Sequence, residues 1–236
     1  MTLLPGSLRA ALVAAGLVMA PLAQANLVLN GSFENTTATQ TDYFIGKVAN
    51  WGNSNIGEAI VLPSWYTLGY LFPGVGVAGA LPQSSPDGGN FVFSDGDFMN
   101  SAITQTLTGL TPGATYAISF WEGLIEDTEI FTTPGPVSGH WLVSLGSNSA
   151  NGALMTGNGI TQTFTNWQQE TLYLKANSST EVLSFLSVGA GDPPLVLLDG
   201  VNVTELPEPA TLGLTLAAVL AGGTVYRRRR WQAAGA

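Results

Sequence analysis

The sequence predicts an all-β protein, an antiparallel β-sandwich flanked by an N-terminal signal peptide and a C-terminal transmembrane helix. Three observations support this. Glycine or proline interrupts nearly every window of the central chain that could hold an amphipathic helix, and short runs of alternating apolar residues recur there instead. An apolar segment also lies near each end of the chain. Because cysteine is absent, the exported part must be held together by its core or by a metal ion.

Residues 1–25 predict an export signal. Arg9 precedes an apolar stretch (10–22), and Ala23-Gln24-Ala25 forms a small-residue cleavage site. We expect cleavage between Ala25 and Asn26. The alternative is an uncleaved anchor or a buried helix, although the apolar stretch is short for a membrane span.

The exported domain, residues 26–206, is long enough for one domain with a core of its own. Its only cations are Lys47 and Lys175, against fifteen carboxylates. Such a surface repels nucleic acid and anionic headgroups. It suits neutral ligands, or anionic ligands held through a bridging cation.

Eight runs have the composition and length of strands. TYAISFW (115–121) shows the pattern clearly, since Tyr116, Ile118 and Phe120 fall on one face. It follows a Pro-Gly turn, so we expect 102–107 and 115–121 to form a strand pair. The other runs are NLVLN (26–30), NFVFS (90–94), HWLVSLG (140–146), QQETLYLKA (168–176), TEVLSFLSV (180–188) and PLVLLDGVNVT (194–204).

Three stretches resemble the galactose-binding-like jelly-roll sandwiches found in many carbohydrate-binding modules. NLVLNGSFE (26–34) resembles their opening strand, ITQTLTGLTPGATYAISFW (103–121) their central hairpin and LLDGVNVT (197–204) their closing strand. The resemblance implies a jelly-roll fold and a carbohydrate-associated role. Segment 35–90 matches none of these motifs.

The C-terminal segment, 207–236, resembles a PEP-CTERM sorting signal. That family combines Pro-Glu-Pro, an apolar helix and an arginine-rich end. The matching residues are Pro207, Glu208 and Pro209, then Arg227, Arg228, Arg229 and Arg230. The resemblance implies an exosortase-like processing enzyme as partner, in a Gram-negative bacterium that makes exopolysaccharide.

The physics of this tail agrees with a membrane span. Residues 210–226 carry no charge and as a helix would be roughly 25 Å long, near the short limit for a bilayer. The arginines would hold their end in the cytoplasm. Pro207 and Pro209 keep the approach extended and open to a processing enzyme. The alternatives are a permanent tail anchor and a soluble core helix.

Glu34 and Asp199 are the candidate metal ligands. At a period of two, the residues expected on the face of Asp199 are Leu195, Leu197, Val201 and Val203. A carboxylate among apolar neighbours must be paired, protonated or metal-bound. The jelly-roll resemblance implies a structural Ca²⁺ between the opening and closing motifs, held by their acids and by backbone carbonyls. A hydrogen-bonded aspartate is the alternative, since Gly200 stands where many relatives have a second Asp.

The long loop expected at 35–90 is rich in aromatic residues. Trp51, Trp65 and Tyr66 are the candidate sugar-binding platform, because pyranose faces stack on rigid rings. Packing within the loop or the core is the alternative.

A second expected loop, 122–139, is acidic and contains Glu122, Glu126, Asp127 and Glu129. Two carboxylates can catalyse glycoside hydrolysis, although clustered acids usually form a solvated face. His140 has no accompanying nucleophile motif and is expected to be structural. SDGDFMN (94–100) lacks the terminal Glu of a calcium loop and is expected to be a polar turn.

Together these features predict a non-enzymatic protein that is exported, anchored in the inner membrane as a precursor and then placed at the cell surface or in the extracellular matrix. Exopolysaccharide is the expected partner, and nucleic acid is not. One alternative is a glycan hydrolase that uses the acids of 122–129. Another is a purely structural matrix protein without a small ligand.

Overall fold

The computed structural model describes residues 25–37, 48–53, 59–62, 85–97, 101–126, 135–158, 165–191 and 194–207. Every regular element among them is a strand, which confirms the all-β prediction. The strands are β1 (Gly52–Asn53), β2 (Ala59–Leu62), β3 (Phe91–Asp95), β4 (Ile103–Thr108), β5 (Thr115–Glu126), β6 (Val137–Leu145), β7 (Asn148–Asn151), β8 (Met155–Gly157), β9 (Gln168–Lys175), β10 (Thr180–Ala190) and β11 (Pro194–Glu205).

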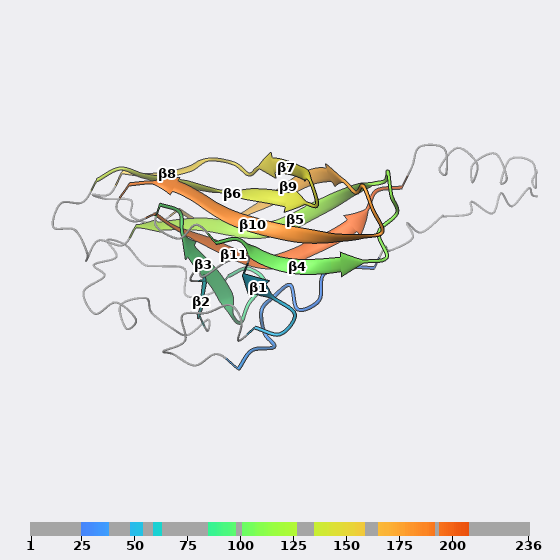
Figure 1. Cartoon of the computed structure of the whole chain (residues 1–236). Coiled ribbons are helices and arrows are strands. Elements are labelled where there is room, and N and C mark those ends of the chain that lie inside the picture. Colours follow the sequence, from blue (N-terminus) through green and yellow to red (C-terminus); the bar gives the residue numbers. More distant parts are fainter. Residues whose placement is uncertain are drawn as a thin grey trace, which may run out of the picture.

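The strands form two antiparallel sheets that pack face to face. One sheet has the order β1-β4-β10-β6-β7, with β8 pairing β6, and the other has the order β2-β3-β11-β5-β9. The chain changes sheet from β1 to β2, from β3 through β4 and β5 to β6, and from β8 through β9 and β10 to β11. Figure 1 shows the long strands β5, β6, β10 and β11 running along the sandwich, with the short strands β1, β2 and β3 grouped together.

The core lies between the sheets and follows from the alternation of the strands. In β6 every second residue is buried, from Val137 to Leu145. At the centre, the rings of Phe120 and Trp141 each meet Phe185 edge to face, with centroids 5.2 and 6.1 Å away. Such aromatic contacts add to the hydrophobic stabilisation of burial.

The expected pairing of 102–107 with 115–121 is wrong. Both strands form, but β4 pairs with β1 and β10, whereas β5 pairs with β11 and β9. The Pro-Gly turn crosses the end of the sandwich, and the amide of Gly113 donates to Ala176 O (2.7 Å). The apolar faces of β4 and β5 therefore look at each other across the core, and Leu107 and Tyr116 are both buried there.

The opening motif is not a strand. Residues 26–30 lie outside both sheets and end in a bend at Leu29 and Asn30; individual hydrogen bonds hold them in place. The amide of Leu27 donates to Val203 O (3.0 Å), and the Asn26 carboxamide oxygen accepts the amide of Val203 (2.9 Å). Gln105 also holds Leu29 through both polar atoms of its side chain, at 2.8 Å each.

Two loop predictions also need correction. The acidic segment begins as strand, because β5 continues to Glu126 and pairs there with Pro194 of β11. Within 35–90, β1, β2 and an isolated bridge between Thr36 and Val48 add further β structure.

The predicted signal peptide and tail lie outside the described residues, apart from Ala25 and Pro207. No helix in the described ranges has the length and hydropathy needed to cross a membrane. The signal peptide and the transmembrane helix therefore stay predictions.

Candidate functional site

A bulge in β11 decides where Asp199 points. The register between β11 and β5 shifts between Asp199 and Asn202, and Gly200 has a positive φ of 58°. Leu198 and Val201 consequently both belong to the core. Asp199 and Val201 thus do not share a face, so the expected period-two face is wrong beyond the bulge. Asp199 lies on the outward side of the five-stranded sheet, opposite Trp121 in the register.

Asp199 is nevertheless completely buried. Its Oδ1 accepts the amide of Gly200 (2.7 Å), while its Oδ2 is buried without a hydrogen-bond partner among the described residues. Burial raises the pKa of Asp199 to about 8; hydrogen bonds from Ser85 and Gly200 oppose the rise, and the charges of Asp87 and Glu34 add to it. Near neutral pH this carboxyl is poised either to keep its proton or to bind a cation.

Glu34 lies near Asp199 and packs against the 85–90 turn. Its carboxylate accepts the backbone amide and the side-chain amide of Asn90, and the side chain is exposed. A Cβ on Gly89 would collide with this carboxylate. The structure therefore brings the two predicted ligands into one region and adds Asp87, which the sequence analysis did not single out.

The surroundings partly fit a Ca²⁺ ion. The buried, unpartnered Oδ2 of Asp199 and the nearby carboxylates of Glu34 and Asp87 are the hard oxygen donors that Ca²⁺ prefers, although the ion needs six to eight oxygens. No group of three or more acidic, His or Cys side chains in the described ranges is close enough to hold a metal by itself. Backbone carbonyls or water would have to complete the shell, and the Ca²⁺ site stays a proposal.

A shallow pocket of about 320 Å³ adjoins this cluster. It lies between the opening segment and the bulge, and its lining includes Asn26, Ser32, Asp87 and Gly200. Gly31 makes the close approach possible, since a Cβ there would lie 2.0 Å from Val201 O. The amide of Val201 donates to Gly31 O at 3.0 Å, so this contact clamps the opening segment onto the closing strand.

Trp51 is not available as a sugar platform. It is only 5% exposed, its indole N–H donates to Asn30 O (2.8 Å), and its ring lies 5.2 Å from Phe33. The prediction for Trp51 is therefore wrong, and the alternative of core packing is correct for this residue. Trp65 and Tyr66 lie outside the described residues.

Glu122 is sealed inside the sandwich. Its Oε1 accepts the side-chain amide of Gln168 (2.9 Å), and its Oε2 is buried without a partner among the described residues. Burial raises the pKa of Glu122 to about 7; the Gln168 hydrogen bond opposes this, and the charge of Glu170 adds to it. A carboxyl in this position cannot reach a surface polymer. The Glu126 side chain, Asp127 and Glu129 lie outside the described residues.

Two further expectations concern residues without a proposed catalytic role. The amide of Asp97 donates to the Asp95 carboxylate (2.9 Å), and Gly96 and Asp97 form a turn, as expected for the described part of 94–100; residues 98–100 lie outside the described residues. His140 is half-buried on β6, and its Nδ1 is buried with no hydrogen-bond partner in the described part of the chain. This position agrees with a structural histidine.

The start of the predicted sorting signal directly adjoins the folded body. The amide of Leu206 donates to Thr115 O (2.8 Å), so ladder-like bonding continues up to the residue before Pro207. One residue earlier, the Glu205 carboxylate accepts the hydroxyls of Thr111 and Tyr116, both at 2.8 Å. The remainder of the motif, Glu208 and Pro209, and Arg227 to Arg230 lie outside the described residues.

No protein-family model matches this chain, and no curated protein is similar to it. Among solved structures, the family 61 carbohydrate-binding module TmCBM61, in complex with β-1,4-galactotriose, is similar at 15% identity and a TM-score of 0.43, covering 77% of this chain and 99% of the module. The C-terminal family 22 carbohydrate-binding module of Clostridium thermocellum Xyn10B is 12% identical (TM-score 0.42; 74% and 98% covered).

The K1 cleaved adhesin domain of Lys-gingipain from Porphyromonas gingivalis W83 is 16% identical, with a TM-score of 0.43 and coverage of 75% and 96%. The two-sheet antiparallel architecture of the present chain follows independently from its own strand pairing.

Proposed function

We propose that this is an exported, non-enzymatic surface or matrix protein that associates with neutral polysaccharide. The observation that carries the proposal is the chemistry of the two outward sheet faces. The outward positions of β4, β10, β6, β9, β5 and β11 carry mostly hydroxyl, amide, apolar and aromatic side chains, and the acidic or cationic residues among them are Lys175 and the buried Asp199. Such faces can hydrogen-bond a polyhydroxylated chain without the desolvation cost of buried charges.

The six-stranded sheet illustrates this chemistry. Its outward positions on β4, β10 and β6 alternate with the buried core residues, and Lys, Arg, Asp and Glu are all absent from them. These outward residues are Thr104, Thr106, Thr108, Val182, Ser184, Leu186, Val188, Ser138, His140, Leu142 and Ser144.

The described acids support a role without catalysis, because several already serve the fold. Glu181 accepts the amides of Asn177 and Ser178 (3.0 and 3.2 Å), and Glu170 accepts the amide of Ala153 (3.1 Å). Glu122 is buried between the sheets. Glycoside hydrolysis needs two carboxyl groups facing one bond at the surface, and the described parts of the 122–129 segment supply none.

Sorting belongs to the same proposal and rests on the tail sequence. Pro207-Glu208-Pro209, the apolar segment 210–226 and the four arginines are the parts that a membrane-embedded processing enzyme would recognise. Release by an exosortase-like peptidase would convert an inner-membrane precursor into a surface or extracellular protein.

A glycan array combined with a hydrolysis screen tests the proposal on the same preparation of full-length protein. We expect binding to at least one neutral polysaccharide and no release of reducing ends. Reducing-end release that disappears on mutation of Glu126 or Glu129 would favour the hydrolase instead. Absence of both binding and hydrolysis would favour a purely structural matrix protein.

A further inference from the structure

We propose that the outward face of the five-stranded sheet is the polysaccharide site, and that a neutral glycan chain lies along a strip running from Trp121 to Tyr173. The inference rests on the proposed function and assigns its polymer to one surface. Sequence reasoning placed the aromatic platform in segment 35–90 and overlooked both of these residues.

The strand register arranges this face in three rows across β9, β5 and β11. The outward direction is clear, because the intervening residues of β5, Tyr116, Ile118 and Phe120, all lie in the core. The first row is Tyr173, Ala117 and Thr204; the second is Thr171, Ser119 and Asn202; the third is Gln169, Trp121 and the buried Asp199. Two aromatic rows thus enclose one polar row.

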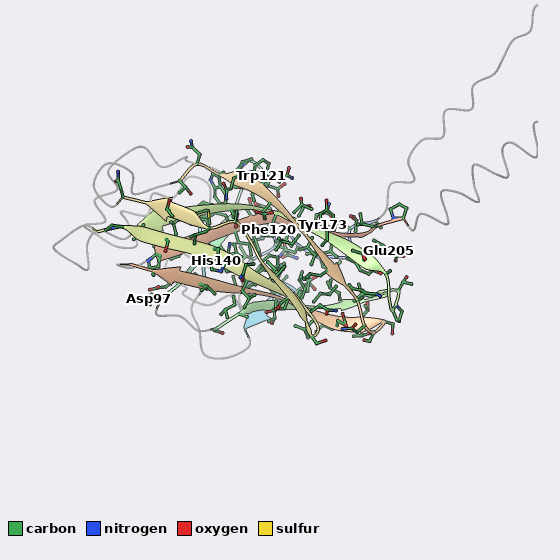
Figure 2. All side chains as sticks on the ribbon, turned by 90° about the horizontal axis from the view of Figure 1, so that it is seen from above. Asp97, Phe120, Trp121, His140, Tyr173 and Glu205 are labelled. Carbon is green, nitrogen blue, oxygen red and sulfur yellow. The ribbon has the colours of Figure 1, made fainter. Side chains whose placement is uncertain are left out.

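The two aromatic side chains are both accessible. Tyr173 is 61% exposed, an unusual state for a large ring, and Trp121 is half-buried. Ala117, which stands beside Tyr173 in the register, has only a methyl side chain. Figure 2 shows both residues, with Tyr173 nearer the end of the sandwich at which Glu205 lies.

Trp121 is held in a fixed position. A Cβ on Gly200 would lie 2.9 Å from Trp121 Cδ1 and 3.3 Å from the Asp87 side chain, so the indole packs closely over the bulge. A rigid ring loses little conformational freedom when a ligand stacks on it. The bulge therefore holds the Trp121 ring in place before a ligand binds.

The length of the strip selects a chain over a single sugar. Tyr173 pairs with Ala117, four residues along β5 from Trp121, which corresponds to roughly 13 Å along the strand plus about 4.8 Å across to β9. This span exceeds one pyranose ring. Thr171, Ser119 and Asn202, between the rings, offer hydroxyl and amide groups for the hydroxyls of the intervening sugars.

Charge selects a neutral occupant. The only ionisable carboxyl in the three rows is Asp199, which is buried, and among the described residues the only nearby cation is Lys175, beyond the Tyr173 row. One lysine does not compensate for the excess of acids on the domain, so an anionic polymer is disfavoured. Two rings separated by a row of polar residues also do not form the closely packed apolar centre of a protein–protein interface.

Native affinity gels containing soluble β-1,4-galactan, xylan or mixed-linkage β-glucan test the inference, with polygalacturonate as an anionic comparison. The full-length chain is used, with Tyr173→Ala, Trp121→Ala and the matched control Leu154→Ala, whose side chain is 64% exposed and belongs to none of the three rows. We expect a neutral polymer to retard the wild type and the control equally. The apparent Kd of Tyr173→Ala should rise at least tenfold with an unchanged Tm.

The outcomes separate the site from the function. If a neutral polymer retards the wild type and Tyr173→Ala equally, the strip is not the site, although the proposed function stands. If no neutral polymer retards the wild type, both ideas fail. A Tyr173→Ala change that alters the molar mass in light scattering but not the retardation identifies a self-association face and overturns the inference. If Trp121→Ala lowers the Tm, loss of binding by that variant could come from unfolding, and the test of the strip then rests on Tyr173→Ala.

Discussion

At the scale of single residues, two buried carboxyl groups stand on opposite sides of the same sheet. Glu122 points into the core, whereas Asp199 lies on the outward side beneath the 85–90 turn. Each has one oxygen without a hydrogen-bond partner among the described residues. Ionising either group leaves a buried charge poorly compensated, which explains why both pKa values rise.

The pKa of Glu122 predicts how stability depends on pH. The folded pKa of about 7 lies above the ordinary value of 4.5, so between these values the folded state binds more protons than the unfolded state. The free energy of unfolding must therefore fall as pH rises through this window, by at most about 1.4 kcal/mol per pH unit for one group. Asp199, shifted from 3.8 to about 8, acts in the same direction.

Thermal unfolding at pH 5, 6, 7 and 8 in a chelating buffer measures this effect. We expect the Tm to fall with pH, and Glu122→Gln, which keeps a hydrogen-bonding partner for Gln168, should flatten the slope. A Tm that rises between pH 5 and 8, or a variant with the slope of the wild type, contradicts the assignment.

Asp199 also predicts a response to metal. If Ca²⁺ binds Asp199 and Glu34, chelation should lower the Tm and excess Ca²⁺ should restore it, since a ligand of the folded state stabilises that state. Asp199→Asn should abolish the response, while Asp97→Asn, in a turn elsewhere, should preserve it. The Ca²⁺ proposal is contradicted if the wild type contains no metal by elemental analysis and its Tm does not respond to the chelator. Asp199 is then a protonated structural residue.

At the scale of elements, the contact between the opening segment and β11 depends on Gly31. Gly31→Ala would place a Cβ 2.0 Å from Val201 O and 3.3 Å from the Val28 side chain. Because Val201 donates its amide to Gly31 O, the backbone cannot withdraw without breaking that bond. We expect destabilisation by about 1–3 kcal/mol.

Denaturant unfolding checks this expectation against Gly135→Ala, where an added Cβ meets nothing within 4 Å. The control should change the unfolding free energy by no more than about 0.5 kcal/mol. Equal midpoints for the two variants would show that the opening segment does not contribute to the cooperative fold.

The long strands of the core could be predicted from the sequence, because alternation directly encodes one buried face, as in 140–146 and 180–188. The opening run 26–30 was wrongly predicted as a strand, and the short strands β1 and β2 were missed. Pairing could not be predicted. A Pro-Gly turn between apolar strands fits both a hairpin and a crossover between sheets, and only tertiary packing distinguishes them. The bulge at Gly200 likewise inserts one residue and reverses the faces beyond it, which period-two reasoning cannot anticipate.

The candidate site was predictable only in part, for the same reason. Glu34 and Asp199 were found from motifs and do lie together. Tyr173 lay in a predicted strand, but its role as a binding residue depends on the neighbours that the strand register places beside it. Trp51 was chosen only because its segment is rich in aromatic residues, and that composition does not distinguish a sugar-binding platform from a core residue.

At the scale of the whole molecule, both ends of the domain 26–206 are hydrogen-bonded to central strands of the five-stranded sheet, the first to β11 and the last to β5. Asn26, the expected new N-terminus, accepts the amide of Val203, and Leu206 donates to Thr115 of the neighbouring strand. The domain therefore has little free chain between its fold and the two predicted processing sites.

The mature mass in a native host tests both sites together. We expect a protein that begins at Asn26 and ends near Pro207-Glu208-Pro209, and a heavier form that keeps its arginines when the exosortase-like peptidase is deleted. Changing Arg227 to Arg230 to Gln should weaken membrane retention. An identical arginine-bearing mass in both strains identifies an ordinary tail anchor, and recovery of Met1 excludes signal cleavage.

The short distance from β11 to Pro207 has a mechanical consequence. If the precursor is tethered and binds a polymer as proposed, tension between the tail and the sheet face would act lengthwise on β11. That strand is central in its sheet, bonded to β3 on one side and to β5 on the other. Its ladder bonds are then loaded in parallel, as in a lap joint under shear, and many must yield together before the strand slides. A tether at an edge strand would peel its bonds apart one by one.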